Sequence, residues 1–317
     1  SKSKIDFNIL FFWYYWQKLY KLYQILVKKN MKDVTVIGGS GFLGSEVSKE
    51  LIKKNYQVKI FDKKKPKFSH KNLKYINGDI INKNELEKVI KNSLYVFNFA
   101  GIADLDYGVS QPTKSIEQNV LATVNMLAFC KKYRVNRFIF ASTIYVYSSK
   151  GGFYRCSKQA AENYIEEYQK KFKLNYTILR YGSLYGPDAG TNNGLSKIIL
   201  NSLKQKKIVY EGSPNTIREY IHVNDAAKSS VDILDKKFAN KSIILKGEYP
   251  IHMKDLLKTL SEILGYKKIY FKKVRNENHY EQTPYSYVPK LGIKYKTNTY
   301  VDFGQGILQL IDTLKKK

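Results

Sequence analysis

The stretch TVIGGSGFLGSEV, residues 35–47, joins a run of β-branched residues directly to a helical pattern. Its glycines fit two spacings at once, Gly39-x-Gly41-x-x-Gly44 and Gly38-x-x-Gly41-x-x-Gly44. Because glycine has no β-carbon, the backbone can turn tightly there and approach an anion closely, while N–H groups of the following helix face the anion. The stretch therefore predicts a strand, a phosphate-binding turn and a helix.

An acidic residue stands at the distance from this turn that a dinucleotide site requires. Asp62 ends the next β-branched run, 18 residues beyond Gly44. A carboxylate in that place accepts hydrogen bonds from the ribose hydroxyls and repels a 2′-phosphate, which favours NAD over NADP. Lys63 and Lys64 follow immediately and weaken this preference. NAD is the predicted cofactor.

Outward from this stretch, short apolar runs alternate with longer helical patterns. We expect strands near 33–39, 56–62, 73–78, 93–101, 135–143 and 174–181, and helices near 44–55, 82–92, 112–133 and 154–172. Almost entirely apolar strands that alternate with helices are typical of a parallel sheet covered on both faces. The predicted fold class is α/β, a doubly wound parallel sheet of the Rossmann type, with residues 31–180 as the NAD-binding domain.

The alternation breaks after residue 181. Residues 182–194 are rich in turn formers, and helical patterns at 194–204, 223–236 and 253–264 follow with a short strand at 241–246. We expect residues 181–317 to form mainly a smaller substrate-binding lobe. It is interleaved with returns to the sheet at about 215–246.

Residues 1–30 differ in kind from the rest. They are apolar and aromatic, but polar residues such as Asp6, Asn8, Gln17 and Lys18 interrupt them too often for a membrane-spanning helix. Met31 opens the first strand pattern, so we interpret residues 1–30 as an extension without function. Contact of residues 5–27 with a membrane surface stays open as an alternative.

The composition argues against several partner classes. The formal charge is +28, but the excess lysine is scattered along the chain with abundant Asn, Ile and Tyr, which indicates compositional bias rather than a nucleic-acid site. Only Cys130 and Cys156 are present, and neither has metal-ligand spacing with a histidine. We therefore predict no metal and a cytoplasmic location, with Cys156 as a small core-facing side chain.

The octapeptide GGFYRCSK, residues 151–158, places Tyr154 one helical turn before Lys158. A tyrosine and a lysine at that spacing can share a proton. The chain contains a second such pair, Tyr14 and Lys18, so the motif alone carries little weight. Its surroundings decide, because Tyr154 opens a helix just after a strand that ends in Ser142 and Thr143, whereas nothing comparable surrounds Tyr14.

Together these motifs resemble the extended short-chain dehydrogenase/reductases, specifically their nucleotide-sugar epimerase/dehydratase branch, over residues 33 to about 225. Five further segments agree with it: GDI at 78–80, NFAG at 98–101, FIFASTIYVY at 138–147, LRYGSLYGP at 179–187 and REYIHVND at 218–225. The resemblance implies Thr143, Tyr154 and Lys158 as catalytic residues. The implied cofactor-binding residues are Gly38, Gly41, Phe42, Leu43, Gly44, Asp62, Asp79, Ile80, Phe99, Ala100, Gly101, Ser142, Tyr154, Lys158 and Tyr181. The implied substrate-binding residues are Thr143, Ser183 and Arg218.

The resemblance assigns a chemical role to each catalytic residue. We expect the ammonium of Lys158 to lower the pKa of Tyr154, so that the phenolate takes a proton from a sugar hydroxyl as hydride leaves the same carbon. Thr143 would donate a hydrogen bond to that oxygen. Return of the hydride to the other face of a 4-keto intermediate then inverts the centre, and Arg218 would anchor the substrate diphosphate.

Departures from the family pattern narrow the activity. Ile144 and Tyr145 replace the acids that dehydratases and decarboxylases carry after the catalytic threonine, which favours a nucleotide-sugar 4-epimerase. An NAD(P)H-dependent keto-sugar reductase and a non-catalytic dinucleotide-binding scaffold remain alternatives. The segment between Thr143 and Tyr154 is shorter than in relatives, and residues 281–292 lack the second phosphate-binding arginine.

By analogy with the family, a homodimer is expected to pair through helices 112–133 and 154–172. The same analogy makes a nucleotide sugar the expected substrate. His222 and Asn119 are interpreted as structural residues.

Overall fold

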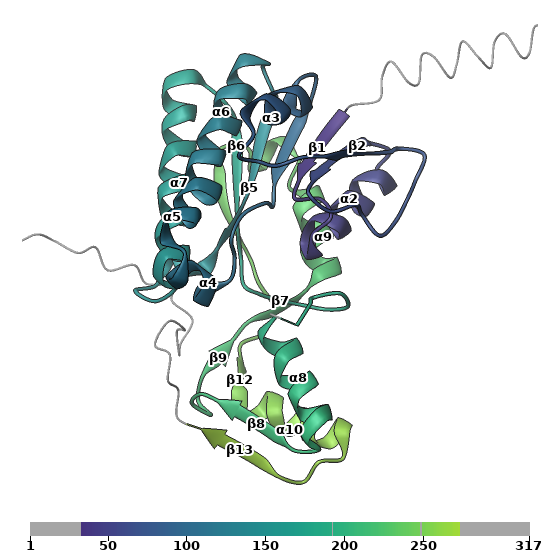
Figure 1. Ribbon diagram of the computed structural model, residues 1–317, viewed down its shortest axis with the longest axis vertical. Coiled ribbons are helices and arrows are strands. Elements are labelled where there is room, and N and C mark those ends of the chain that lie inside the picture. Colours follow the sequence, from purple (N-terminus) through teal and green to yellow (C-terminus); the bar gives the residue numbers. More distant parts are fainter. Residues whose placement is uncertain (1–32, 192, 248, 273–317) are drawn as a thin grey trace, which may run out of the picture. The chain divides into compact units, whose positions relative to one another are not determined.

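A parallel sheet of seven strands forms the centre of the protein, in a computed structural model that describes residues 33–191, 193–247 and 249–272 (Figure 1). The strand order is β11-β6-β5-β4-β1-β2-β3, and every neighbouring pair is parallel. The strands are β1 (Asp33–Ile37), β2 (Gln57–Asp62), β3 (Leu73–Asn77), β4 (Tyr95–Asn98), β5 (Arg137–Thr143), β6 (Tyr176–Tyr181) and β11 (Lys241–Leu245). The predicted doubly wound parallel sheet is confirmed, and its order reverses beside β1, where such folds bind dinucleotides.

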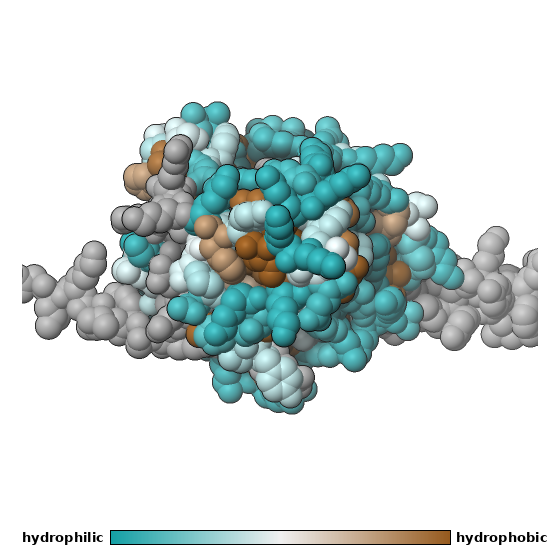
Figure 2. Space-filling view, turned by 90° about the horizontal axis from the view of Figure 1, so that it is seen from below, coloured by the Kyte–Doolittle hydropathy of each residue, from teal (hydrophilic) through white to brown (hydrophobic). Residues whose placement is uncertain are grey.

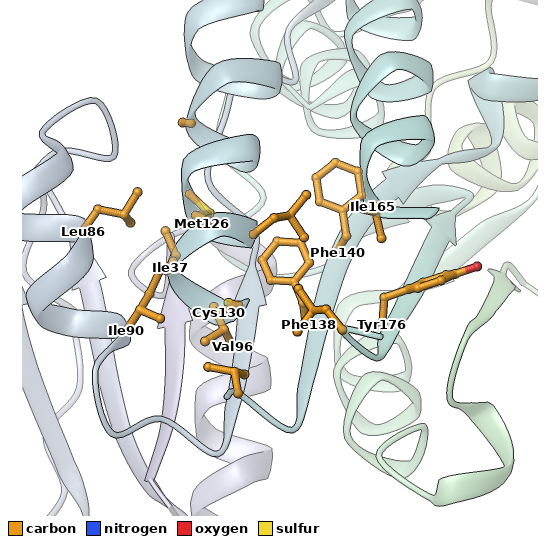
Figure 3. Packing of buried hydrophobic residues seen from close by; sticks show 14 of the residues in the cluster. Ile37, Leu86, Ile90, Val96, Met126, Cys130, Phe138, Phe140, Ile165 and Tyr176 are labelled. Atoms are coloured by element: carbon orange, nitrogen blue, oxygen red, sulfur yellow. The ribbon is translucent and has the colours of Figure 1, made fainter. Parts of the chain in front are cut away.

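Helices cover both faces of this sheet, which is why its strands are apolar on both sides. α2 (Phe42–Lys53) and α9 (Val223–Asp232) bury their apolar residues against one face. α3 (Lys83–Ile90), α6 (Ala122–Lys132) and α7 (Gly152–Phe172) bury theirs against the other, in the core that Figure 3 shows. Burial of this apolar area is the main favourable term in folding.

The predicted helix at 112–133 is continuous but not uniformly α-helical. After the short α4 (Leu105–Ser110), the chain forms α5 (Pro112–Ser115), then the π-helical segment η1 (Ile116–Leu121), then α6. A π segment holds one more residue per turn than an α-helix and rotates the side chains that follow it. It is found frequently at functional sites, and here it carries the buried Asn119.

A smaller lobe lies beyond the carboxyl ends of the strands. Its core cluster joins α8 (Gly194–Gln205) and α10 (Met253–Leu264) to the parallel pair β8 (Ile208–Glu211) and β13 (Ile269–Lys272). Residues 183–252 also contain two small strand pairs, β7 (Ser183–Tyr185) with β10 (Tyr220–His222) and β9 (Ile217–Arg218) with β12 (Ile251–His252). Figure 2 views this end and shows hydrophobic residues surrounded by hydrophilic ones.

Residues 215–246 contain elements of the central sheet region and of the small strand pairs. α9 packs against α2, and β11 pairs with β6 at the sheet edge, whereas β9 and β10 belong to the small strand pairs. α9 ends at Asp232, four residues before the predicted helix end, and the 3-10 turn η3 (Lys236–Phe238) follows it. The domain division at residue 180 stays a prediction, and residues 1–30 lie outside the described residues. In the described part of the chain, no helix has the length and apolar character needed to cross a membrane.

Candidate active site

The glycine-rich turn between β1 and α2 forms a close-fitting cradle. A β-carbon on Gly44 would lie 2.2 Å from the Gly38 carbonyl oxygen, and one on Gly38, whose φ is 78°, would lie 2.6 Å from the Ala100 nitrogen. α2 begins after Gly41 without a side-chain cap, so the N–H groups of its first turn point out toward a ligand position. These features are those of a pyrophosphate-binding turn.

Asp62 lies at the carboxyl end of β2 and already holds this turn. One carboxylate oxygen accepts a hydrogen bond from the Ser40 N–H at 3.0 Å, and the other accepts one from the Lys64 N–H at 3.0 Å. The side chain of Lys63 is directed to Asp79 in an ion pair of 2.8 Å. Burial opposes ionisation of Asp79, yet the hydrogen bond from Lys63 leaves its pKa below the usual value. Lys63 is therefore engaged away from the ribose position beside Asp62.

The loop after β4 is fastened to the helices behind it. Asn98 accepts a hydrogen bond from the Ala100 N–H and donates one to Thr123. Asn119, in η1, accepts from the Ile102 N–H at 2.8 Å, and donates both to the Ile102 carbonyl and to the Ser157 hydroxyl at 2.9 Å. The π segment thus connects the predicted cofactor loop, Phe99 to Gly101, to the helix that carries Tyr154.

The structure brings Thr143, Tyr154 and Lys158 together at the carboxyl end of β5. A hydrogen bond joins the Tyr154 and Thr143 side chains. Lys158 is 6% exposed and donates a hydrogen bond of 2.7 Å to the Ala141 carbonyl. Its ammonium nitrogen lies 5.9 Å from the centre of the Tyr154 ring.

The short segment between Thr143 and Tyr154 folds tightly over α7. It forms the 3-10 turn η2 (Ile144–Tyr147), and the Tyr145 ring meets the Tyr154 ring edge-on at 6.4 Å. Gly151 has a φ of 95°, and a β-carbon there would lie 2.7 Å from the Tyr145 ring. Arg155 and Gln159 of α7 donate hydrogen bonds to the carbonyls of Ser148 and Val146. Tyr145 therefore lies directly beside Tyr154.

The protonation of the pair differs from the expectation that Lys158 lowers the phenol's pKa. Burial raises the pKa of Tyr154 to about 12, opposed only by the hydrogen bond from Thr143. Burial also lowers the pKa of Lys158 to about 8, and the negative charge of Glu162 opposes this shift. In the ligand-free protein both groups thus favour their neutral forms more than in water.

Ser142 and Tyr181 lie at this edge, but their side chains are engaged in the interior. The Ser142 hydroxyl donates to Glu162 at 2.5 Å, and the Tyr181 hydroxyl shares a 2.6 Å hydrogen bond with Ser230 of α9. Burial raises the pKa of Tyr181. Any contact of these two residues with a cofactor would come from their main chains.

The predicted substrate residues come from neighbouring strands. The Ser183 N–H donates to the Glu219 carbonyl, beside the pairing of β7 with β10. Arg218 is the last residue of β9 and comes directly before Glu219. One Arg218 amino group donates to the Ile217 carbonyl at 2.9 Å. The predicted roles of both residues stay predictions.

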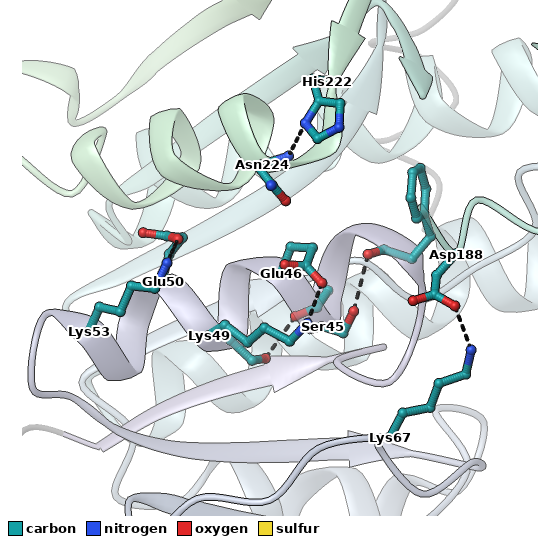
Figure 4. Close-up of polar contacts among 12 residues, drawn as sticks. Ser45, Glu46, Lys49, Glu50, Lys53, Lys67, Asp188, His222 and Asn224 are labelled. Carbon is teal, nitrogen blue, oxygen red and sulfur yellow. Dashed lines mark hydrogen bonds and ion pairs between the residues drawn. The ribbon is translucent and has the colours of Figure 1, made fainter. Parts of the chain in front are cut away.

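The structure also shows the positions of His222 and Cys156. His222 caps α9 by accepting a hydrogen bond from the Asn224 N–H, a structural role (Figure 4). The prediction for Cys156 was wrong, because its side chain is exposed. It follows Phe153 and precedes Asn163 on the outer stripe of α7, while Ser157 and Lys158 point to the sheet. The described residues contain no group of three or more metal-ligating side chains.

Sequence reasoning missed a buried ion pair beside the site. Glu162, one turn after Lys158, pairs with Arg180 of β6 at 2.6 Å. The only signal in the sequence was a glutamate four residues after the lysine, on the face of the helix that the lysine shares.

This fold and site define a dinucleotide-binding oxidoreductase of the extended short-chain type. The family model for the NAD-dependent epimerase/dehydratase family matches residues 34–245, and the chain belongs to that family. It is an NAD-dependent enzyme.

Known proteins similar to this chain include epimerases and a dehydratase. A putative UDP-glucose 4-epimerase of Methanocaldococcus jannaschii is 26% identical over 89% of this chain and 98% of its own length. A dTDP-D-glucose 4,6-dehydratase of Dictyostelium discoideum is 28% identical over 65% of this chain and 56% of its own length. The crystal structure of a Thermotoga maritima UDP-glucose 4-epimerase with UDP-glucose matches at a TM-score of 0.73 and 25% identity, covering 80% of this chain and 90% of that one.

The residues present fit NAD. The cradle around Gly38 and Gly44 leaves no room for side chains, the start of α2 is uncapped, and the Asp62 carboxylate lies beside this turn, where it accepts a hydrogen bond from the Ser40 N–H. A group with a pyrophosphate and an unphosphorylated ribose matches these three features.

Replacing Asp62 by alanine is expected to weaken NAD roughly 10- to 100-fold, because a charged hydrogen-bond acceptor is lost. NADP should weaken no more than about threefold, since removal of the carboxylate also removes its repulsion of the 2′-phosphate. Calorimetric titration of the protein with each cofactor measures both. Equal losses for NAD and NADP would contradict the assigned role of Asp62.

Proposed function

We propose that this enzyme epimerises a nucleotide sugar at C4, with Tyr154 as the general base and acid. The observation that carries the proposal is the hydrogen bond between the Thr143 and Tyr154 side chains, with the buried Lys158 nitrogen 5.9 Å from the centre of the Tyr154 ring. These three groups lie at the carboxyl end of β5, and the neighbouring strand β4 leads into the loop from Phe99 to Gly101. Such an arrangement can move one proton to and from a sugar hydroxyl.

NAD held by the turn around Gly38 and Gly44 would supply a hydride acceptor for the sugar carbon, and its oxidised ring would bring a positive charge to the site. In its presence the buried phenol of Tyr154 has a second cation nearby, which favours the phenolate. Tyr154 then removes the proton of the sugar hydroxyl, and Thr143 donates a hydrogen bond to the same oxygen. The 4-keto sugar rotates so that its other face receives the returning hydride, and Tyr154 gives the proton back to the C4 oxygen.

Lys158 has two tasks in this proposal. As an ammonium it favours the Tyr154 phenolate, and its remaining protons can hold the nicotinamide ribose. Because burial brings its pKa to about 8, the ammonium form declines as the pH rises through that value.

The substrate class follows from the family and from this chain's own residues. Relatives with UDP-glucose 4-epimerase activity in their names, and the solved structure with UDP-glucose, favour a UDP-sugar. Arg218 would anchor the diphosphate. Ile144 and Tyr145 provide no carboxyl group, which disfavours the elimination of water.

We also propose a cytoplasmic homodimer that pairs through η1, α6 and α7. These helices are adjacent. They expose large apolar side chains: Ile116, Leu121, Phe153, Tyr164 and Phe172. Sedimentation at micromolar concentration should give twice the 36.9 kDa chain mass. A monomer would contradict the pairing.

A panel of UDP-, GDP-, CDP- and dTDP-sugars tests the proposed activity. Absorbance near 340 nm and the identity of the sugar are followed together. We expect at least one UDP-sugar to be converted to its C4 epimer without net formation or consumption of NADH. Net consumption of NADH with a keto-sugar would instead identify a reductase, and no turnover in the presence of bound NAD would contradict catalysis.

A further inference from the structure

Glu162 is a buried carboxylate near the proposed catalytic residues, and it accepts three hydrogen bonds. It is 5% exposed, on the face of α7 that meets the sheet. One carboxylate oxygen accepts from the Ser142 hydroxyl at 2.5 Å and from Arg180 Nε at 3.1 Å. The other accepts from Arg180 Nη2 at 2.6 Å. The pair with Arg180 is bidentate, the geometry that fixes orientation most firmly.

Each partner of Glu162 adjoins a predicted catalytic residue. Ser142 precedes Thr143, and the register of β5 and β6 sets Ser142 directly opposite Arg180. Arg180 also donates a hydrogen bond to the Tyr147 hydroxyl in η2, the turn that begins just after Thr143. The network therefore ties together the strand end, the turn and the helix that position the catalytic set.

Glu162 does not touch the reacting atoms. Among the described residues, its carboxylate makes no hydrogen bond to Tyr154 or Lys158, and Lys158 donates to the Ala141 carbonyl instead. Lys158 lies one turn before Glu162 on the same buried face. The carboxylate thus acts on the ammonium through charge, across a medium of low dielectric constant where such an effect is strong.

The other titratable groups around Lys158 do not replace this carboxylate. On α7 there is Tyr154, whose ring centre lies 5.9 Å from the Lys158 nitrogen, and on β6 there is Arg180, which pairs with Glu162. The neutral Phe140 ring, 4.6 Å from the Lys158 nitrogen, and the Ala141 carbonyl face it from β5. Arg180 is itself a cation, so without Glu162 its charge would repel the ammonium.

We propose that Glu162 is a positioning residue for hydride transfer, held by Arg180 and Ser142 so that Lys158 stays charged and the Thr143 strand end stays aligned with α7. This inference rests on the proposed function for its kinetic consequence. Burial lowers the pKa of Lys158 to about 8, and the negative charge of Glu162 opposes that shift. Removal of the carboxylate should therefore lower the pKa of Lys158 further.

The test is Glu162→Gln in the NAD-loaded enzyme, with a folded state checked by thermal melting. We expect kcat to fall about 10- to 100-fold while KM changes less than threefold, because the variant leaves the substrate site intact. The high-pH limb of kcat/KM should move to lower pH by about one pH unit. The affinity for NAD is measured by calorimetry on cofactor-stripped protein from pH 6 to pH 9. The pH at which this affinity begins to fall should be lower in the variant by the same amount.

Asp33→Asn is the control. It removes a carboxylate that pairs with Lys59 at 3.7 Å, and Asp33 is the first residue of β1, at the end of the strand away from the site. It should leave kcat and the pH profile unchanged. Ser142→Ala, which removes one donor but keeps the ion pair, should shift the profile in the same direction by less. If Glu162→Gln does not fold, the pH profile of Ser142→Ala tests the inference instead.

A folded Glu162→Gln with kcat within threefold of wild type and an unmoved pH profile would overturn the inference. So would an equal loss in Asp33→Asn, or an unchanged profile in Ser142→Ala when Glu162→Gln does not fold. If the wild-type protein converts no nucleotide sugar, the proposed activity is wrong. The pH dependence of NAD affinity still tests Glu162 in that case.

Discussion

Tyr154→Phe is expected to lower turnover of the nucleotide sugar by about 1000-fold or more, because general acid–base catalysis by a positioned group contributes 10²- to 10⁴-fold. The substitution removes one oxygen from a half-buried side chain and leaves the ring in place against Tyr145. NAD affinity should therefore stay within about threefold of wild type, since the phenol oxygen holds no part of the pyrophosphate cradle. Single-turnover measurements with NAD-loaded protein give the hydride-transfer rate directly.

Tyr164→Phe provides the control for that experiment. Tyr164 lies on the same helix, but its side chain is 49% exposed and faces away from the sheet. Its substitution should leave hydride transfer unchanged. A near-normal rate in Tyr154→Phe would show that another group is the base.

Lys158→Met is expected to abolish turnover and yet to stabilise the fold near neutral pH. Burial lowers the pKa of Lys158 from 10.5 to about 8, so the folded state binds its proton less tightly than the unfolded state does. The cost of the buried charge is present in full below pH 8, and it disappears as the pH rises toward 10.5. Replacement by methionine could recover up to about 3 kcal/mol in the free energy of unfolding at pH 7.

Denaturant unfolding of both proteins at pH 7 and at pH 10 checks this prediction. We expect Lys158→Met to be the more stable protein at pH 7, with a smaller difference at pH 10. Lower stability of the variant at pH 7 would mean that the hydrogen bond to the Ala141 carbonyl and the contact with the Phe140 ring outweigh the burial of charge.

The sequence predicted the features that have local signals. Strands such as residues 95–98 and 137–143 have apolar residues on both faces at their centres, Val96 and Phe97 in one and Phe138 to Ala141 in the other, so their burial on both faces followed from the sequence. The glycine spacing predicted the turn, because a close backbone approach requires residues without a β-carbon. Asp62 was predicted separately, from its distance along the chain after the turn. Thr143, Tyr154 and Lys158 were predicted from the resemblance of their segments to the family, and they lie together in the structure.

Other features depend on contacts that sequence spacing does not reveal. The Glu162 network exists because the β5–β6 register sets Ser142 opposite Arg180, a pairing set by the packed sheet. The π segment at Ile116–Leu121 has no compositional signature, so a single helix was expected. The pKa of Tyr154 could not be predicted from its distance to Lys158 along the helix, because burial dominates it. Cys156 was misassigned because the buried stripe of α7 passes through Ser157 and Lys158 instead.

The most direct test of the proposed chemistry follows deuterium from C4 of the nucleotide sugar that the panel identifies. If Tyr154 moves only the hydroxyl proton and the hydride goes to NAD and back, the epimerised product should retain deuterium at C4, with no exchange into solvent and no net NADH. Epimerisation with loss of the C4 deuterium to water would contradict the account, because it would mean that a carbon-bound proton is abstracted instead.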